Sequence, residues 1–133
     1  MSEARCLICL GEMGAGEASY HPACCRELFD ASMPPLLPYS QEDMDKLAAK
    51  VVRQHVTVPG VQPKLSLHLE REAKKGAGRF TIVGLEGGYI LKPPVTRYPE
   101  MPELEHLTMR MAACFGIATA PCGLLRMQDG RHA

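Results

Sequence analysis

The stretch KLSLHLEREAKKGAGRFTIVGLEGGYILKPP, residues 64–94, decides the fold. In its first part, Leu65, Leu67 and Leu69 alternate with polar residues, which predicts a strand with one buried face. The polar, glycine-containing run REAKKGAG that follows is typical of a turn. The segment therefore opens with a strand and a loop.

Two further runs complete the stretch, RFTIVG at 79–84 and YILK at 89–92, and both are rich in β-branched or aromatic residues. Gly87 and Gly88 lie between them and favour a second turn. Together the three runs predict a three-stranded antiparallel meander, which needs helices to cover it.

A helix is predicted before this sheet, from Gln41 to about Gln54. Ser40 followed by Asp43 resembles a capping box. Apolar residues then recur at the helical spacing i, i+3, i+4 and i+7, as Met44, Leu47, Ala48 and Val51.

A second helix is predicted after the sheet, in EMPELEHLTMRMAACFG at 100–116, with Gly116 where it would end. Its apolar residues form a stripe that we expect to cover the sheet: Leu104, Leu107, Met111 and Phe115. The remaining IATAPCGLLRMQDGRH predicts a short strand that ends in a turn at Asp129 and Gly130.

These elements indicate an α+β fold, an antiparallel sheet with packed helices, preceded by a small zinc-ribbon-like module. We expect the cysteine-rich module at 1–32, a connector at 33–40 that contains three prolines, and the main domain at 41–133. The 133 residues are 46% apolar, which is enough for a core.

Charge and hydropathy exclude several classes of function. Fifteen basic residues balance fifteen acidic ones, so we expect no direct nucleic-acid binding. No apolar run approaches the length of a membrane span, and the first twenty residues lack the apolar core of an export signal. We therefore expect a cytoplasmic protein without membrane contact.

Four residues near the N-terminus have metal-ligand spacing. Cys6, Cys9, His21 and Cys24 follow the pattern C-x2-C-x11-H-x2-C, which suits a closed, tetrahedral, structural Zn²⁺ site. Cys25 is an alternative fourth ligand. Reduced thiols without a metal are a second interpretation, and a redox role for the CxxC pair lacks the usual strand-to-helix context.

A second set of residues is typical of nucleotide chemistry. TVPGVQPKLSL at 57–67 has a glycine and a lysine four residues apart before a strand, where backbone N–H groups can point at phosphate. Lys92 ends a predicted strand, and Glu103 and Glu105 lie in the next helix. Kinases need a phosphate-contacting lysine held by a carboxylate. Each feature alone also fits a surface turn, a solvated lysine or a helix-dipole partner.

The combination of GVQPKLSL, YILKPP, YPEMPELEHLTMRMAACFGI and APCGLL resembles the small lobe of the HipA-like serine/threonine kinases, the toxins of HipA-type toxin–antitoxin systems. CLIC…YHPACCRELF is similar to the N-terminal extension of some short members of that family.

The resemblance implies roles for individual residues. Lys92 falls on the ATP-contacting lysine, and Glu105 falls on its helix partner. Thr57 falls at or next to an autophosphorylated serine, so a threonine here leaves autophosphorylation open. The loop that contacts the nucleotide phosphates corresponds to Pro59, Gly60, Val61, Gln62, Pro63 and Lys64.

The family continues into a large lobe that bears the catalytic and magnesium-binding aspartates, and nothing after Leu125 resembles it. We therefore expect no catalytic residue in this chain, weak ATP binding, and Mg²⁺ only with the missing lobe. The expected partner is a large-lobe polypeptide or a HipB-like antitoxin. Two alternatives are a non-catalytic binding protein that contacts an antitoxin or cognate kinase, and a zinc-stabilised interaction module.

Overall fold

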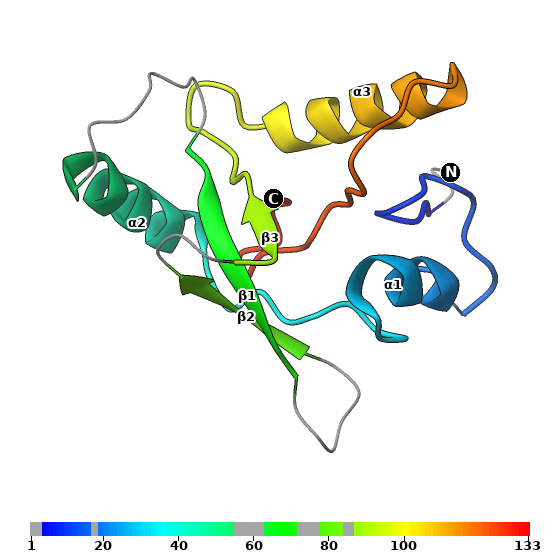
Figure 1. Cartoon of the computed structure of the whole chain (residues 1–133), viewed down its shortest axis with the longest axis horizontal. Coiled ribbons are helices and arrows are strands. Elements are labelled where there is room, and N and C mark those ends of the chain that lie inside the picture. Colours follow the sequence, from blue (N-terminus) through cyan, green and yellow to red (C-terminus); the bar gives the residue numbers. More distant parts are fainter. Residues whose placement is uncertain (1–3, 17–18, 55–62, 72–77, 84–86) are drawn as a thin grey trace.

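A computed structural model describes residues 4–16, 19–54, 63–71, 78–83 and 87–133, and its α+β class agrees with the prediction (Figure 1). Within these ranges, no helix combines the length and the apolar character that crossing a membrane requires. The elements, in chain order, are α1 (Pro22–Phe29), α2 (Gln41–Gln54), β1 (Leu65–Arg71), β2 (Gly78–Val83), β3 (Tyr89–Leu91) and α3 (Met101–Cys114).

The three predicted strands form one antiparallel sheet, but its order is β2-β1-β3, so the predicted meander is wrong. The outer edge of β2 is already taken by the connector. The Leu36 N–H donates to the Gly78 carbonyl at 2.8 Å, and the Phe80 N–H donates to the Leu36 carbonyl at 2.9 Å. With both edges of β2 paired, β3 pairs with the free edge of β1.

One face of this sheet is buried. The register sets Leu65 opposite Leu91 and Leu67 opposite Tyr89, so these side chains share a face. Helix α1, which the sequence analysis does not predict, packs there. Its Phe29 ring lies edge-on to Phe80, with ring centroids 6.0 Å apart.

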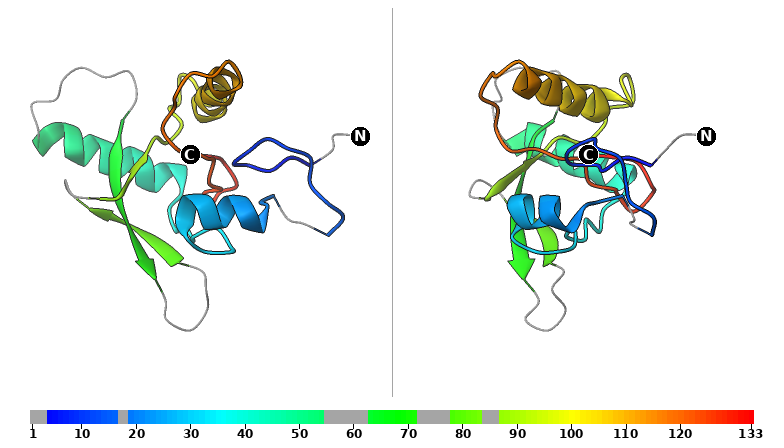
Figure 2. Two further views of the ribbon diagram at one scale, coloured as in Figure 1. Left: turned by 45° about the vertical axis from the view of Figure 1, so that its right-hand side comes forward. Right: turned by 90° about the vertical axis from the view of Figure 1, so that its right-hand side faces the viewer.

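The cysteine-rich segment and the sheet share a single hydrophobic core. Figures 1 and 2 show the C-terminal segment passing between α1 and α3, where it adds side chains to the same core. The buried members of the core are Cys6, Ile8, Cys25, Phe29, Leu37, Met44, Leu65, Leu67, Phe80, Leu91, Leu125 and Met127.

Helix α2 begins with the predicted capping box. The Ser40 N–H donates to Asp43 Oδ2 at 2.8 Å, and the Asp43 N–H donates to Ser40 Oγ at 3.3 Å. The Gln41 N–H donates to Asp129 Oδ2, also at 2.8 Å. The predicted turn at Asp129 and Gly130 is present, but the strand expected before it is reduced to a single bridge between Arg126 and His132.

Helix α3 forms as predicted, but its apolar stripe does not cover the sheet. The buried residues of α3 are instead Pro102 and His106. The 3.6-residue period identifies an apolar face and says nothing of what contacts it. The exposed fractions are 64% for Leu104, 45% for Leu107, 53% for Met111 and 82% for Phe115.

Two neighbouring glycines provide a matched test of how β3 enters the sheet. A Cβ at Gly87 would lie 2.7 Å from the Leu67 carbonyl carbon, whereas a Cβ at Gly88 would meet nothing within 4 Å. We expect Gly87→Ala to lower the free energy of unfolding by roughly 1–3 kcal/mol because the backbone of β1 must shift. Gly88→Ala should stay within about 0.5 kcal/mol. Urea unfolding of both variants measures these free energies. Equal decreases in the two variants would contradict the close packing of Gly87 against β1.

Candidate functional site

The structure brings Lys92 and Glu105 together. Lys92 directly follows β3, Glu105 lies in the first half of α3, and their side chains form an ion pair. The link between them is stiff, because Pro93 and Pro94 are both fully buried. The Pro94 carbonyl also accepts a hydrogen bond from Gln41 Nε2 at 2.8 Å, which ties the link to α2.

Glu103, the other acidic candidate, lies apart from Lys92, and only part of the predicted phosphate loop falls within the described residues. Glu103 pairs with His132 Nδ1 at 2.9 Å and so does not compete for Lys92. Pro63 and Lys64 lead directly into β1, and Lys64 is exposed. The remaining loop residues, Thr57, Pro59, Gly60, Val61 and Gln62, lie outside the described residues.

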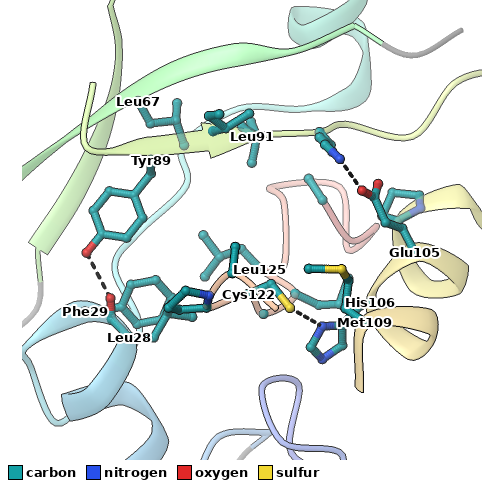
Figure 3. Close-up of a pocket in the computed structure, with 18 of the residues that line it drawn as sticks. Leu28, Phe29, Leu67, Tyr89, Leu91, Glu105, His106, Met109, Cys122 and Leu125 are labelled. Atoms are coloured by element: carbon teal, nitrogen blue, oxygen red, sulfur yellow. Dashed lines mark hydrogen bonds and ion pairs between the residues drawn. The ribbon is translucent and has the colours of Figure 1, made fainter. Parts of the chain in front are cut away.

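A cavity of about 650 Å³ lies between the sheet, α1, α3 and the C-terminal segment (Figure 3). Its walls are mainly apolar, with Leu67 and Leu91 on the sheet side. Polar groups occur at particular places on the wall: the Lys92–Glu105 pair, and Tyr89, whose hydroxyl donates to the Leu28 carbonyl at 2.9 Å. Small-molecule sites commonly have this size and character.

His106 and Cys122 also border the cavity, and sequence analysis did not single out either residue. His106 Nδ1 lies 3.5 Å from Cys122 Sγ. Burial lowers the pKa of His106, partly opposed by the nearby Ile8 backbone, and burial raises the pKa of the Cys122 thiol. Both shifts favour the neutral forms, so the pair is not an activated thiolate.

The four predicted metal ligands converge. Their donor atoms, from Cys6, Cys9, His21 and Cys24, all lie within 4.8 Å of one another. His21 Nδ1 is 3.3 Å from Cys9 Sγ and 3.9 Å from Cys24 Sγ. Zn–S bonds of about 2.3 Å and Zn–N bonds of about 2.0 Å place tetrahedral ligand atoms roughly 3.5–3.8 Å apart. The cluster could therefore hold a structural metal ion.

The loop from Cys6 to Gly11 is folded so that its sulfurs point inward. The Cys6 N–H donates to the Gly11 carbonyl, and the Leu10 N–H donates to the Cys6 carbonyl, each at 2.9 Å. Leu10 takes a left-handed conformation, with φ 62°. The Gly11 N–H then donates to Cys9 Sγ and the His21 N–H to Cys6 Sγ, both at 3.4 Å. Such N–H donors stabilise thiolates.

The imidazole of His21 is oriented so that its Nδ1 atom can bind a metal ion. Its Nε2 lies 3.0 Å from the Glu12 carbonyl oxygen, which is the position for an N–H donor. A proton on Nε2 leaves the Nδ1 lone pair directed at the sulfurs, as in many metal-binding histidines. The backbone therefore favours the tautomer that a metal needs.

The cysteines differ in their electrostatics. Burial, the largest influence on Cys6, would raise its pKa, but backbone N–H groups of Cys9, His21 and Ile8 outweigh burial and lower the pKa to about 7. Burial and the neighbouring sulfurs of Cys9 and Cys6 raise the pKa of Cys24 to about 12. Cys25 is fully buried in the core, and burial raises its pKa. Cys24, not Cys25, lies in the cluster.

Comparison with known proteins places this geometry in a family. The model of the HipA-like C-terminal domain matches residues 56–133. The chain belongs to the HipA-like family. Over 91 residues it is 34% identical to a Haemophilus influenzae protein named "Putative kinase". That alignment covers 68% of this chain but only 24% of the relative's length.

The HipA-like match has a clear boundary within the structure. It includes the sheet, α3 and the Lys92–Glu105 pair, whereas the Cys/His cluster and α1 precede it. The family resemblance of the sequence is thus confirmed for the residues that carry the ion pair. The cluster has to be interpreted from its own geometry.

The hydrogen bond between Tyr89 and Leu28 joins the HipA-like part to α1 and can be tested alone. We expect Tyr89→Phe to lower the free energy of unfolding by about 0.5–1.5 kcal/mol, because the Leu28 carbonyl loses its donor while the ring remains. Tyr98→Phe, at an exposed position, is the control. Thermal unfolding of both variants measures the effect. A free energy of unfolding in Tyr89→Phe equal to that of the parent would show that this contact is not stabilising.

Proposed function

We propose that this chain is the nucleotide-binding small lobe of a HipA-like serine/threonine protein kinase of a toxin–antitoxin system. The observation that carries the proposal is the Lys92–Glu105 pair, which lies within the residues matched by the family model. A lysine at the end of a strand, paired with a carboxylate from the next helix, is the arrangement that kinases use to contact nucleotide phosphates.

The ion pair is accessible to a ligand. The side chains of Lys92 and Glu105 are 36% and 37% exposed, so an anionic phosphate can approach the ammonium group without unfolding the lobe. Glu105 restricts the conformations of the lysine side chain before a ligand binds. This preorganisation reduces the entropy lost on binding.

Ile90 lies in β3, two residues before Lys92, and both residues border the cavity. It is 71% exposed, which is unusual for an isoleucine in a strand. In this proposal the Ile90 side chain packs against the base of the nucleotide. An apolar surface beside a charged phosphate contact matches the two ends of ATP.

The proposal assigns phosphoryl transfer to a part of the kinase beyond these 133 residues, since they match only about a quarter of the relative's length. Bound Mg²⁺ neutralises charge on the phosphates, and its ligands belong to that larger part. The exposed stripe on α3 supports a protein partner, because a contiguous apolar face of this kind is typical of an interaction surface. We assign the stripe to the large lobe; binding of an antitoxin is the alternative.

The nucleotide proposal is tested by removing the lysine. We expect ATP to bind the chain no more tightly than about 1 mM, roughly 4 kcal/mol, because one lobe provides only part of the contact surface. Lys92→Ala should weaken this binding about tenfold or more, because the phosphate loses a charged donor. Chemical-shift titration with ATP measures both.

Lys46→Ala is the matched control, since Lys46 also pairs with a glutamate, Glu42, but on the exposed surface of α2. It should bind ATP like the parent chain. Equal ATP affinity of the parent and Lys92→Ala would refute the proposed site. Micromolar affinity of the parent would refute the inference that another lobe provides part of the contact surface.

We also propose that Cys6, Cys9, His21 and Cys24 bind one structural Zn²⁺. Four soft or borderline donors complete a tetrahedron without an open position, which is the pattern of a structural site. Thiolates packed this closely repel one another, and a divalent cation offsets that repulsion. The segment between the ligand pairs has little apolar surface to bury, so metal binding supplies stability that burial cannot.

Zinc content provides the test of this second proposal. We expect about one equivalent of zinc in the purified chain, lost in Cys9→Ser together with a large drop in the melting temperature. Cys114→Ser, which changes an exposed cysteine outside the cluster, should retain the metal. Cys25→Ala should also retain it. Loss of zinc from Cys25→Ala but not from a Cys24→Ser variant would show that the ligand set is misassigned.

A further inference from the structure

Residues 125–133 fold into a short hairpin, to which the proposed function assigns no role. Reciprocal hydrogen bonds join its two ends. The Leu125 N–H donates to the Ala133 carbonyl at 2.9 Å, and the Ala133 N–H donates to the Leu125 carbonyl at 3.0 Å. Inside them, Arg126 and His132 form an antiparallel bridge. We call this unit the C-terminal hairpin, and its side chains share one connected piece of backbone.

One side chain of the C-terminal hairpin reaches the first turn of α3. His132 Nδ1 lies 2.9 Å from Glu103 Oε1, and because an ionised carboxylate can only accept, Nδ1 carries the proton. The other polar atom of each side chain, Glu103 Oε2 and His132 Nε2, is buried. The contact is therefore partly enclosed, and removal of one partner leaves the other unpaired where water has little access.

Glu103 and Glu105 leave α3 in different directions. At 3.6 residues per turn, positions two residues apart are separated by roughly 200° around the helix axis. His132 thus contacts one side of α3 through Glu103. Lys92 contacts nearly the opposite side, where Glu105 points toward the end of β3 (Figure 3). Two contacts on opposite sides fix the rotation of the helix, which a single ion pair could not.

The C-terminal hairpin also contacts the lysine side of the pair, through α2. Asp129 Oδ2, in the turn of the hairpin, accepts the Gln41 N–H at 2.8 Å. Gln41 is buried, and its Nε2 donates in turn to the Pro94 carbonyl at 2.8 Å. Pro94 lies two residues after Lys92 and is fully buried. The hairpin therefore acts on the backbone close to each partner of the ion pair.

We propose that the C-terminal hairpin is a clamp that holds the Lys92–Glu105 pair together. Its positioning residues are His132, which sets the rotation of α3, and Asp129, which acts through Gln41 on the backbone that follows β3. The inference rests on the proposed nucleotide site, because the pair that the clamp holds is the phosphate contact of that site. When either end of the clamp is released, the carboxylate and the ammonium group meet less often, and the lysine is less well positioned for a phosphate.

Hydrogen exchange of the full chain tests the α3 end of the clamp without a nucleotide. His132→Ala should raise the exchange rates of the α3 amides about fivefold, with those of β1 and β2 unchanged. Glu103→Ala should do the same, and the double variant should exceed neither single variant, because both changes break one contact. Glu103→Gln, whose amide oxygen can still accept from His132, should restore part of the protection. Arg131→Ala, at an exposed position of the hairpin, is the control and should match the parent.

The chemical shift of the Lys92 ε-methylene group reads the ion pair itself. The difference between the parent and Glu105→Ala defines the shift of the unpaired lysine. His132→Ala should move the Lys92 shift at least halfway to that value, and Asp129→Ala should move it in the same direction, whereas Arg131→Ala should leave it unchanged. Loss of stability alone would not move this shift in the folded chain. ATP affinity should fall about threefold in His132→Ala.

The exchange rates and the chemical shifts can each contradict the clamp. It is refuted by α3 exchange in His132→Ala equal to that of the parent, or by effects of His132→Ala and Glu103→Ala that add in the double variant. A Lys92 shift that stays unchanged in both His132→Ala and Asp129→Ala, or in Glu105→Ala, would also overturn it. If the parent binds no ATP, the proposed function fails, and the exchange rates and chemical shifts still decide whether the hairpin holds the pair.

Discussion

The packing of Phe29 against Phe80 and Tyr89 joins the cysteine-rich segment to the sheet. The three rings lie with centroids 5.0–6.1 Å apart, and the Tyr89 hydroxyl is bonded to the carbonyl beside Phe29. Without α1, the inward face of a three-stranded sheet would be open to water. A small sheet of this kind needs a covering layer to be stable, and here the N-terminal segment provides it.

This arrangement explains why the C-terminal segment runs where it does. Gly123 passes so close to α1 and the loop from Cys6 to Gly11 that a Cβ would lie 2.9 Å from both Ile8 and Leu28 side-chain atoms. Leu124 is then bonded on both sides, and burial raises the pKa of the Tyr20 hydroxyl that holds it to about 12. The neutral hydroxyl remains a donor at any ordinary pH. The N-terminal segment therefore also fixes the path of the C-terminal segment.

Local patterns predicted the elements of this fold better than their arrangement. Ser40 with Asp43 identified the start of α2, and alternation identified β1, because both signals lie within a few residues. Strand order depended on Leu36 occupying an edge of β2, a contact between residues 43 apart that no local pattern encodes. Likewise the Cys/His cluster followed from residue types and spacing, and the family resemblance selected Glu105 as the partner of Lys92. No local pattern identified the contact between His106 and Cys122.

The orientation of α3 brings these observations together. Turned the other way, its apolar stripe would face the protein, and burial of Leu104, Leu107, Met111 and Phe115 would favour that packing by several kcal/mol at about 25 cal/mol per Å². The observed orientation gives up this energy to bury Pro102 and His106 and to present Glu105 to Lys92. Contacts of that kind, one ion pair about a third exposed and one buried imidazole, are too weak to outweigh the stripe alone. Burial of the stripe against the proposed protein partner would make this orientation the favourable one.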